Sequence, residues 1–237
     1  MIILEVALLS YFILYPIYIF LTHKAEKLRV LNQQESKVNV YLKTMLNLWI
    51  PVIILGILVV YDDISLIEIG LKWQWDITNS LALLSLILLA GYFLVSLKSL
   101  KNNSDEHSKL KEQYEFIRWF LPVTPRESKY FIFGLSITAG VCEEILFRGY
   151  VMHILSNDLP MYVVIIISSI IFGFGHIYQG ASHVVRTAIL GSIMAVIYLV
   201  TDSLVVPILL HLMLDMYGGA VAYIIFSDKK SEALMTK

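Results

Sequence analysis

Cysteine is almost missing from this sequence, which has Cys142 as its one example among 237 residues. A lone cysteine excludes an internal disulfide and a cysteine-based metal site. Charge is scarce as well: 16% of the residues are charged, against roughly 25% in soluble domains. The formal net charge of −1 leaves no excess of positive charge for a basic face, so we expect no nucleic-acid partner.

Apolar residues are in excess instead and make up 58% of the chain. A transmembrane helix needs about 20 predominantly apolar residues, and several segments approach that length. We therefore predict an all-α fold, a polytopic transmembrane helix bundle of about seven helices in the lipid bilayer. The predicted helices are Ile2–Leu21, Tyr41–Tyr61, Ile77–Leu97, Tyr130–Met152, Pro160–Ile177, Val184–Val200 and Leu204–Phe226.

Lysine and arginine gather in alternate loops. They are frequent after the first and third predicted helices and in the C-terminal tail, whereas Lys72 is the only one in residues 62–76. Because positively charged loops stay on the cytoplasmic side, we predict an outside N-terminus and a cytoplasmic C-terminus, with the cell membrane as the location. The chain then divides into residues 1–123, with three helices and cytoplasmic loops, a membrane domain at 124–226, and a cytoplasmic tail at 227–237. Thr124 and Pro125 are suited to the N-cap and first position of the fourth helix.

Ionisable side chains concentrate in the C-terminal half. A charge at the centre of a membrane helix costs about 2.5–3.5 kcal/mol, so such residues are rare and usually functional. The second and third predicted helices have none in their apolar middles. With a rise of about 1.5 Å per residue, the ionisable residues of the last four helices can meet near mid-membrane and form one site. They are Glu143, Glu144, Arg148, His176, His211 and Asp215.

The spacing of these residues suggests how they divide the work. Glu144 and Arg148 lie four residues apart and can pair along one helix face. Glu143 is turned from Glu144 by about 100° and has no intrahelical cation, which suits a carboxyl that exchanges protons as a general base. His211 and Asp215 are also four apart, so the carboxylate can orient the imidazole or share a ligand with it.

Each residue alone also has a structural interpretation. A lone histidine in a membrane helix, such as His176, is a packing residue bonded to a carbonyl about as often as it is a functional residue. Glu144 with Arg148 can be a structural ion pair. Two acids, two histidines and a further carboxylate on three helices are too many for packing alone. The set as a whole therefore favours a functional site.

The motifs in these helices resemble those of the CAAX-protease and bacteriocin-processing (CPBP, or Abi) family of intramembrane proteases. The resemblance covers roughly residues 124–226. Each motif alone is weak, but the three in this order, each inside a predicted membrane helix, are specific. The matches are Glu143, Glu144 and Arg148 to EExxxR, Phe172 and His176 to FxxxH, and His211 and Asp215 to HxxxN/D.

The resemblance implies a division of roles. Glu143 is then the general base that activates a water molecule, and His176 helps to position that water. Glu144 and Arg148 shape the site, while His211 and Asp215 stabilise the oxyanion or complete the water site. The family has been described both as metalloproteases and as metal-independent glutamate proteases.

The choice between these mechanisms stays open in the sequence. An ionised Asp215 only accepts hydrogen bonds, so it suits orienting a histidine or binding a metal better than touching an oxyanion. A divalent metal such as zinc would take Glu143, His176, His211 and Asp215 as ligands, but there is no HExxH motif. We favour chemistry with no cofactor.

The leading hypothesis is an intramembrane endopeptidase that hydrolyses a peptide bond of a membrane-associated protein or peptide. One alternative is a non-catalytic membrane regulator or bacteriocin-immunity protein of the same fold. A proton-coupled transporter is a third hypothesis, disfavoured because the polar residues lie in one half of the chain with no paired broken helices. The sequence leaves open the substrate, any prenyl group on it and the oligomeric state.

Overall fold

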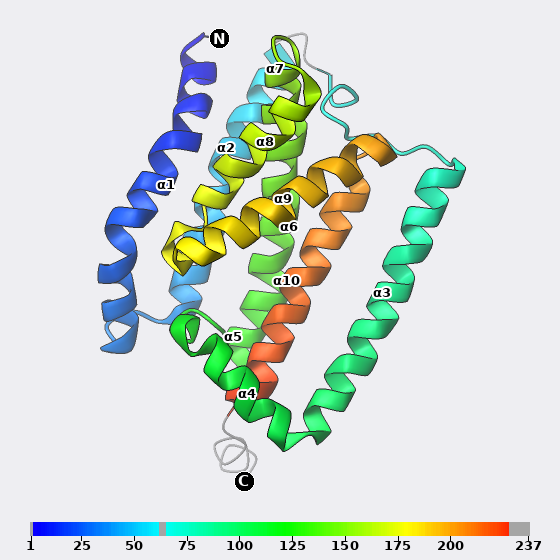
Figure 1. Ribbon diagram of the computed structural model, residues 1–237. Coiled ribbons are helices and arrows are strands. Elements are labelled where there is room, and N and C mark those ends of the chain that lie inside the picture. The colour runs from blue at the N-terminus through cyan, green and yellow to red at the C-terminus, as the bar shows by residue number, and fades with distance from the viewer. Residues whose placement is uncertain (1, 62–64, 228–237) are drawn as a thin grey trace.

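The structure, a computed structural model, describes residues 2–61 and 65–227, and this part of the chain is all-α (Figure 1). Six helical stretches of the described residues are long and apolar enough to cross a membrane. Five of them are single helices or parts of one: α1 (Ile2–Leu31), α2 (Lys37–Tyr61), α3 (Ile77–Asn102), α9 (Ala181–Thr201) and α10 (Val205–Phe226). The sixth, Pro125–Ser156, is built from several consecutive segments.

The prediction of seven spans is thus confirmed for six helices, and the fifth is shorter than predicted. Helix α8 (Met161–Phe174) has 14 residues, which is about 21 Å at 1.5 Å per residue, against a hydrocarbon core of about 30 Å. The predicted range 160–177 was wrong at its C-terminal end. After α8 the chain forms a turn that contains the 3₁₀ helix η4 (Ile177–Gln179), and Gly180, with φ of +99°, redirects it into α9.

This turn lies beside α1 and short of the end of the bundle at which α4 and α5 lie (Figure 1). Helix α9 starts there and runs obliquely across the bundle toward the start of α10. Helix α9 begins at Ala181, three residues before the predicted start at Val184, and it includes Arg186.

The helical stretch Pro125–Ser156 begins as predicted. Thr124 accepts a hydrogen bond from the amide of Glu127, the Glu127 side chain accepts from the amide of Thr124, and Pro125 holds the first helical position. This capping box satisfies amides that have no intrahelical partner. The stretch then contains two π-helical segments, which are uncommon and frequent at functional sites. Its segments are α5 (Pro125–Tyr130), η2 (Phe131–Leu135), α6 (Ser136–Glu144), η3 (Ile145–Val151) and α7 (Met152–Ser156).

Two glycines allow the helices around this stretch to approach closely. A Cβ atom on Gly140 would lie 2.9 Å from the backbone nitrogen of Leu212, so α6 and α10 meet almost backbone to backbone. A Cβ atom on Gly173 would lie 2.7 Å from the carbonyl oxygen of Val184, where α8 meets α9. Small residues at such crossings permit close packing, and in lipid it is this packing, not a hydrophobic driving force, that holds helices together.

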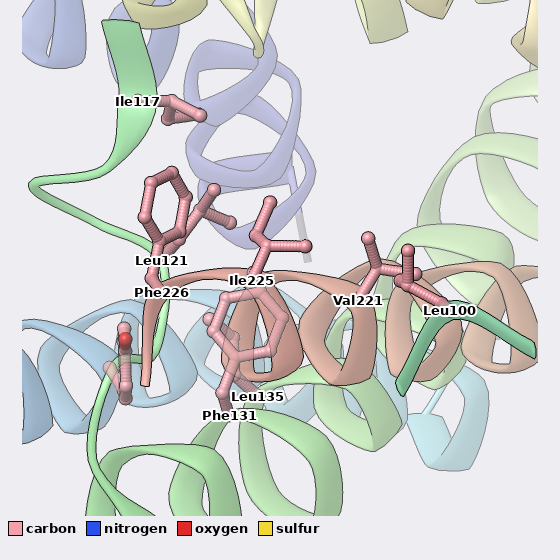
Figure 2. Close-up of a cluster of buried hydrophobic side chains, with 10 residues drawn as sticks. Leu100, Ile117, Leu121, Phe131, Leu135, Val221, Ile225 and Phe226 are labelled. Atoms are coloured by element: carbon pink, nitrogen blue, oxygen red, sulfur yellow. The ribbon is translucent and has the colours of Figure 1, made fainter. Parts of the chain in front are cut away.

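A cluster of buried apolar side chains closes the end of the bundle at which α10 ends (Figure 2). It joins the ends of α3 and α10 to the segment after α4 (Ser104–Tyr114), which includes the 3₁₀ turn η1 (Glu115–Ile117). Helices α1 and α3 stand on opposite sides of the bundle (Figure 1) and expose many large apolar side chains, as expected for lipid contact. The members of the cluster are Tyr41, Leu100, Ile117, Leu121, Phe131, Leu135, Val221, Ala222, Ile225 and Phe226.

Candidate active site

Glu144, at the end of α6, is the centre of a buried polar network. Its Oε1 atom accepts a hydrogen bond from Arg148 Nη1 at 2.8 Å and another from His211 Nδ1 at 2.7 Å. The Glu144 side chain is fully buried. The pairing of Glu144 with Arg148 predicted from their spacing is confirmed, and the second partner, His211 on α10, adds a polar contact between α6 and α10.

Arg148 contacts groups from three helical segments. Its Nη2 atom donates to the carbonyl oxygen of Gly191 on α9 at 3.1 Å, and its guanidinium lies 4.3 Å from the ring centroid of Phe172 on α8. The side chain is only 1% exposed. One arginine therefore fixes three helices relative to one another, and the geometry of a buried guanidinium, with its planar set of donors, suits this.

His211 turns its second nitrogen toward the cavity. Because a carboxylate only accepts hydrogen bonds, the bond to Glu144 requires that Nδ1 carries a hydrogen, and Nε2 then faces the other acids. The His211 Nε2 atom lies 3.8 Å from Glu143 Oε2 and 3.7 Å from Asp215 Oδ2. Asp215, the carboxylate predicted from its spacing to orient His211, lies beyond hydrogen-bond distance, and Glu144 makes the hydrogen bond instead.

His176 lies in the turn after α8 and not within a helix, contrary to the prediction. Its Nδ1 atom is 3.0 Å from the carbonyl oxygen of Phe172. A carbonyl only accepts, so Nδ1 is the donor and a neutral His176 presents Nε2 as a hydrogen-bond acceptor. The same Phe172 ring lies 5.1 Å from the His176 ring and 6.0 Å from the His211 ring, centroid to centroid, so it separates and positions the two imidazoles.

A cavity of about 420 Å³ brings the acids and the histidines together. Glu143, His176, His211 and Asp215 all line it, while Glu144 and Arg148 lie behind its wall. The Glu143 side chain is 14% exposed and that of Asp215 40%. A smaller cavity of about 80 Å³ on the α1 side is also lined by Glu143 and His176, so these two residues stand between two spaces.

The contact residues that the sequence could not reveal are aromatic or backbone groups. Tyr178 and Phe120 line the cavity, and their rings meet with centroids 6.0 Å apart, yet nothing in their sequence pattern distinguishes them from core aromatics. The carbonyl of Gly191 has no sequence signal at all. Phe172 does have one, because it is the first residue of the FxxxH motif.

A metal ion fits the described part of the chain poorly. No group of three or more His, Cys, Asp or Glu side chains in it has an arrangement that could hold a metal ion. The bond from His176 Nδ1 to a carbonyl leaves its Nε2 open, and His211 Nε2 lies 3.7 and 3.8 Å from Asp215 and Glu143, but the four predicted ligands do not come together as a group that could hold a metal ion.

Comparison with known families supports the interpretation of this site. Residues 125–217 match the family model described as type II CAAX prenyl endopeptidase Rce1-like. That range contains all six predicted site residues, from Glu143 to Asp215. No curated protein and no solved structure matches the chain.

Proposed function

Because residues 125–217 form a domain of the Rce1-like CAAX endopeptidase family, whose members are peptide-bond hydrolases, we propose that this multi-pass membrane protein is an intramembrane endopeptidase in which Glu143 activates the hydrolytic water. The observation that carries the proposal is the approach of Glu143 Oε2 to His211 Nε2, 3.8 Å apart, at the wall of a cavity. The substrate is a peptide bond in a membrane-associated protein or peptide.

In this mechanism Glu143 is the general base. Its carboxylate takes a proton from a water molecule, and the water oxygen attacks the carbonyl carbon of the scissile bond. The tetrahedral intermediate collapses, the C–N bond breaks, and the proton held by Glu143 moves to the leaving nitrogen. His176 Nε2 accepts a hydrogen bond from the attacking water and so directs its lone pair toward the substrate.

Glu144 and Arg148 have a positioning role in the proposal. The Nδ1 hydrogen of His211 is bound by Glu144, which is itself fixed by Arg148, so the Nε2 atom has one orientation relative to Glu143. Asp215 lies 3.7 Å from the same nitrogen and is the second acid beside it. A charged His211 can stabilise the oxyanion of the tetrahedral intermediate.

We further propose that the N-terminus lies outside the cell membrane and the C-terminus in the cytoplasm. The cavity is lined by Tyr114 and Phe116 from the segment that begins at α4. The α4 region follows α3 in the lysine-rich stretch that we assign to the cytoplasm. The active site would then be reached from the cytoplasmic side of the bilayer.

A cleavage assay tests the proposal. The purified protein is placed in lipid vesicles with a pool of membrane-anchored peptides, and products are identified by mass spectrometry. Glu143→Gln keeps the shape and removes the base, so we expect the rate to fall about 10²–10⁴-fold, the usual contribution of general base catalysis. Glu112→Gln, an exposed glutamate on α4, is the matched control and should cleave like the wild type. Equal cleavage by Glu143→Gln and the wild type contradicts the proposal.

The same assay separates the metal-independent mechanism from a metal mechanism. After treatment with a chelator and removal of it, we expect the cleavage rate to stay unchanged. Loss of cleavage that is restored by zinc would instead assign a metal to the site. A non-catalytic regulator of the same fold would show no cleavage in either sample.

A further inference from the structure

Arg186 is a charge in an unusual place. It is the only Asp, Glu, Lys or Arg in α9, a candidate membrane span, and it lies one and a half turns after the start of that helix. No ion pair in the described part of the chain involves its guanidinium. Unpaired charges inside membrane helices are costly and commonly mark the path of a substrate or ion.

The side chain of Arg186 lines the active-site cavity and is exposed. His183, three residues earlier on the same face of α9, lines the cavity as well, together with the amide side chains of Gln113 and Gln179. This part of the wall therefore consists of hydrogen-bond donors, with one fixed positive charge.

The rest of the cavity carries the opposite charge. Glu143 and Asp215 are its acidic residues, and both stand beside His211. A carboxylate on a bound peptide would be repelled by these two acids and attracted by Arg186. The charge pattern therefore sets the direction in which a peptide lies in the cavity.

We propose that Arg186 binds a side-chain carboxylate of the substrate, so that the enzyme prefers peptides with Asp or Glu close to the scissile bond. The guanidinium offers two parallel N–H donors to the two carboxylate oxygens, and His183 with the two glutamines supplies further polar contacts. This inference rests on the proposed function, because it assigns a substrate class to the same cavity.

Binding to an inactive variant tests the inference separately from catalysis. Immobilised Glu143→Gln protein in nanodiscs is incubated with a pool of N-palmitoylated decapeptides randomised at their last six positions. The pool is made in two forms, with a free and with an amidated C-terminus, and retained peptides are identified by mass spectrometry. Enrichment of Asp and Glu in both forms assigns a side-chain carboxylate. Enrichment of the free form alone, with no preference for Asp or Glu side chains, contradicts the proposal.

The variants then test whether Arg186 is the cause. Adding Arg186→Gln should weaken the binding of retained acidic peptides about tenfold to hundredfold, the range expected for a lost charge-assisted hydrogen bond. Adding Arg186→Glu should reverse the selection toward Lys and Arg. Arg126→Gln, at an exposed position outside the cavity, is the matched control and should retain the same peptides as Glu143→Gln alone.

Three further outcomes overturn the inference. Equal retention of acidic and neutral peptides, including no retention of either, is the first. Unchanged selection in the Arg186→Gln protein is the second. A requirement for anionic lipid in the nanodisc, with no effect of the peptide carboxylate, is the third and would assign Arg186 to a lipid headgroup. Cleavage of retained peptides by the wild-type protein is scored separately, so a failure of the proposed function is distinguishable from a failure at Arg186.

Discussion

Replacing Arg148 by methionine should destabilise the protein far more than an average substitution. Methionine fills much of the same volume but provides none of the hydrogen bonds. Glu144, fully buried, would lose its cationic partner of fixed charge, and the carbonyl oxygen of Gly191 would lose the hydrogen bond from Arg148. Removing one partner of a buried ion pair costs about 3–5 kcal/mol, because the other charge is left uncompensated.

The prediction is checked by reversible unfolding in mixed micelles of a mild detergent and dodecyl sulfate, followed by tryptophan fluorescence. We expect Arg148→Met to lower the free energy of unfolding by about 3–5 kcal/mol. The control Arg126→Met, at an exposed position, should change it by less than about 0.5 kcal/mol.

A double variant provides the stricter test. Glu144→Gln with Arg148→Met removes both charges, so it should be more stable than the sum of the two single variants predicts. Residues in one hydrogen-bond network show coupling of about 0.5–3 kcal/mol, and we expect the upper half of that range. A cost below about 1 kcal/mol for Arg148→Met, or strictly additive effects, would refute the argument that the pair acts as one buried unit.

Three further predictions concern positions around the site. Gly140→Val should lower both the melting temperature and the cleavage rate, because a Cβ there would lie 2.9 Å from the backbone of Leu212; activity equal to the wild type would argue against the close crossing. Phe172→Leu should reduce the free energy of unfolding by about 0.5–2 kcal/mol for the lost cation–π contact with Arg148, measured by the same unfolding assay. Hydrogen bonds from a lysine on α2 and an arginine on α1 hold the pKa of Glu35 below its usual range. Glu35 therefore stabilises the fold above about pH 4.3, and this stabilisation, less than about 1 kcal/mol, is lost as the pH falls. Glu35→Gln should abolish that part of the pH dependence of the free energy of unfolding.

The sequence predicted what depends on composition and local spacing. The apolar segments located six spans, and the four-residue spacing predicted the ion pair between Glu144 and Arg148. The cap at Thr124 followed from local preferences alone. These features are decided within a few residues, so they can be read without knowledge of the fold.

Contacts between helices could not be read in this way. Spacing placed Asp215 next to His211 on one helix, but the hydrogen bond to His211 comes from Glu144 on another. Partner choice across helices depends on how closely α6 and α10 approach, which is decided at Gly140. Likewise, hydropathy extended the fifth helix to Ile177, since Ile and Tyr are as apolar in a turn as in a helix.

The early end of α8 links the chemistry of the site to its specificity. Had the helix continued to cross the bilayer, the start of α9 would have been carried away from Glu143. Because α8 ends at Phe174 and Gly180 turns the chain back with φ of +99°, His176 and Arg186 both reach the cavity that Glu143 lines. One break in a membrane helix thus supplies both the histidine that we assign to the water and the arginine that we assign to the substrate. A residue other than glycine at position 180 would have to adopt this backbone at a cost, so Gly180→Val should slow the cleavage of acidic and neutral peptides alike, whereas Arg186→Gln should slow the cleavage of acidic peptides only.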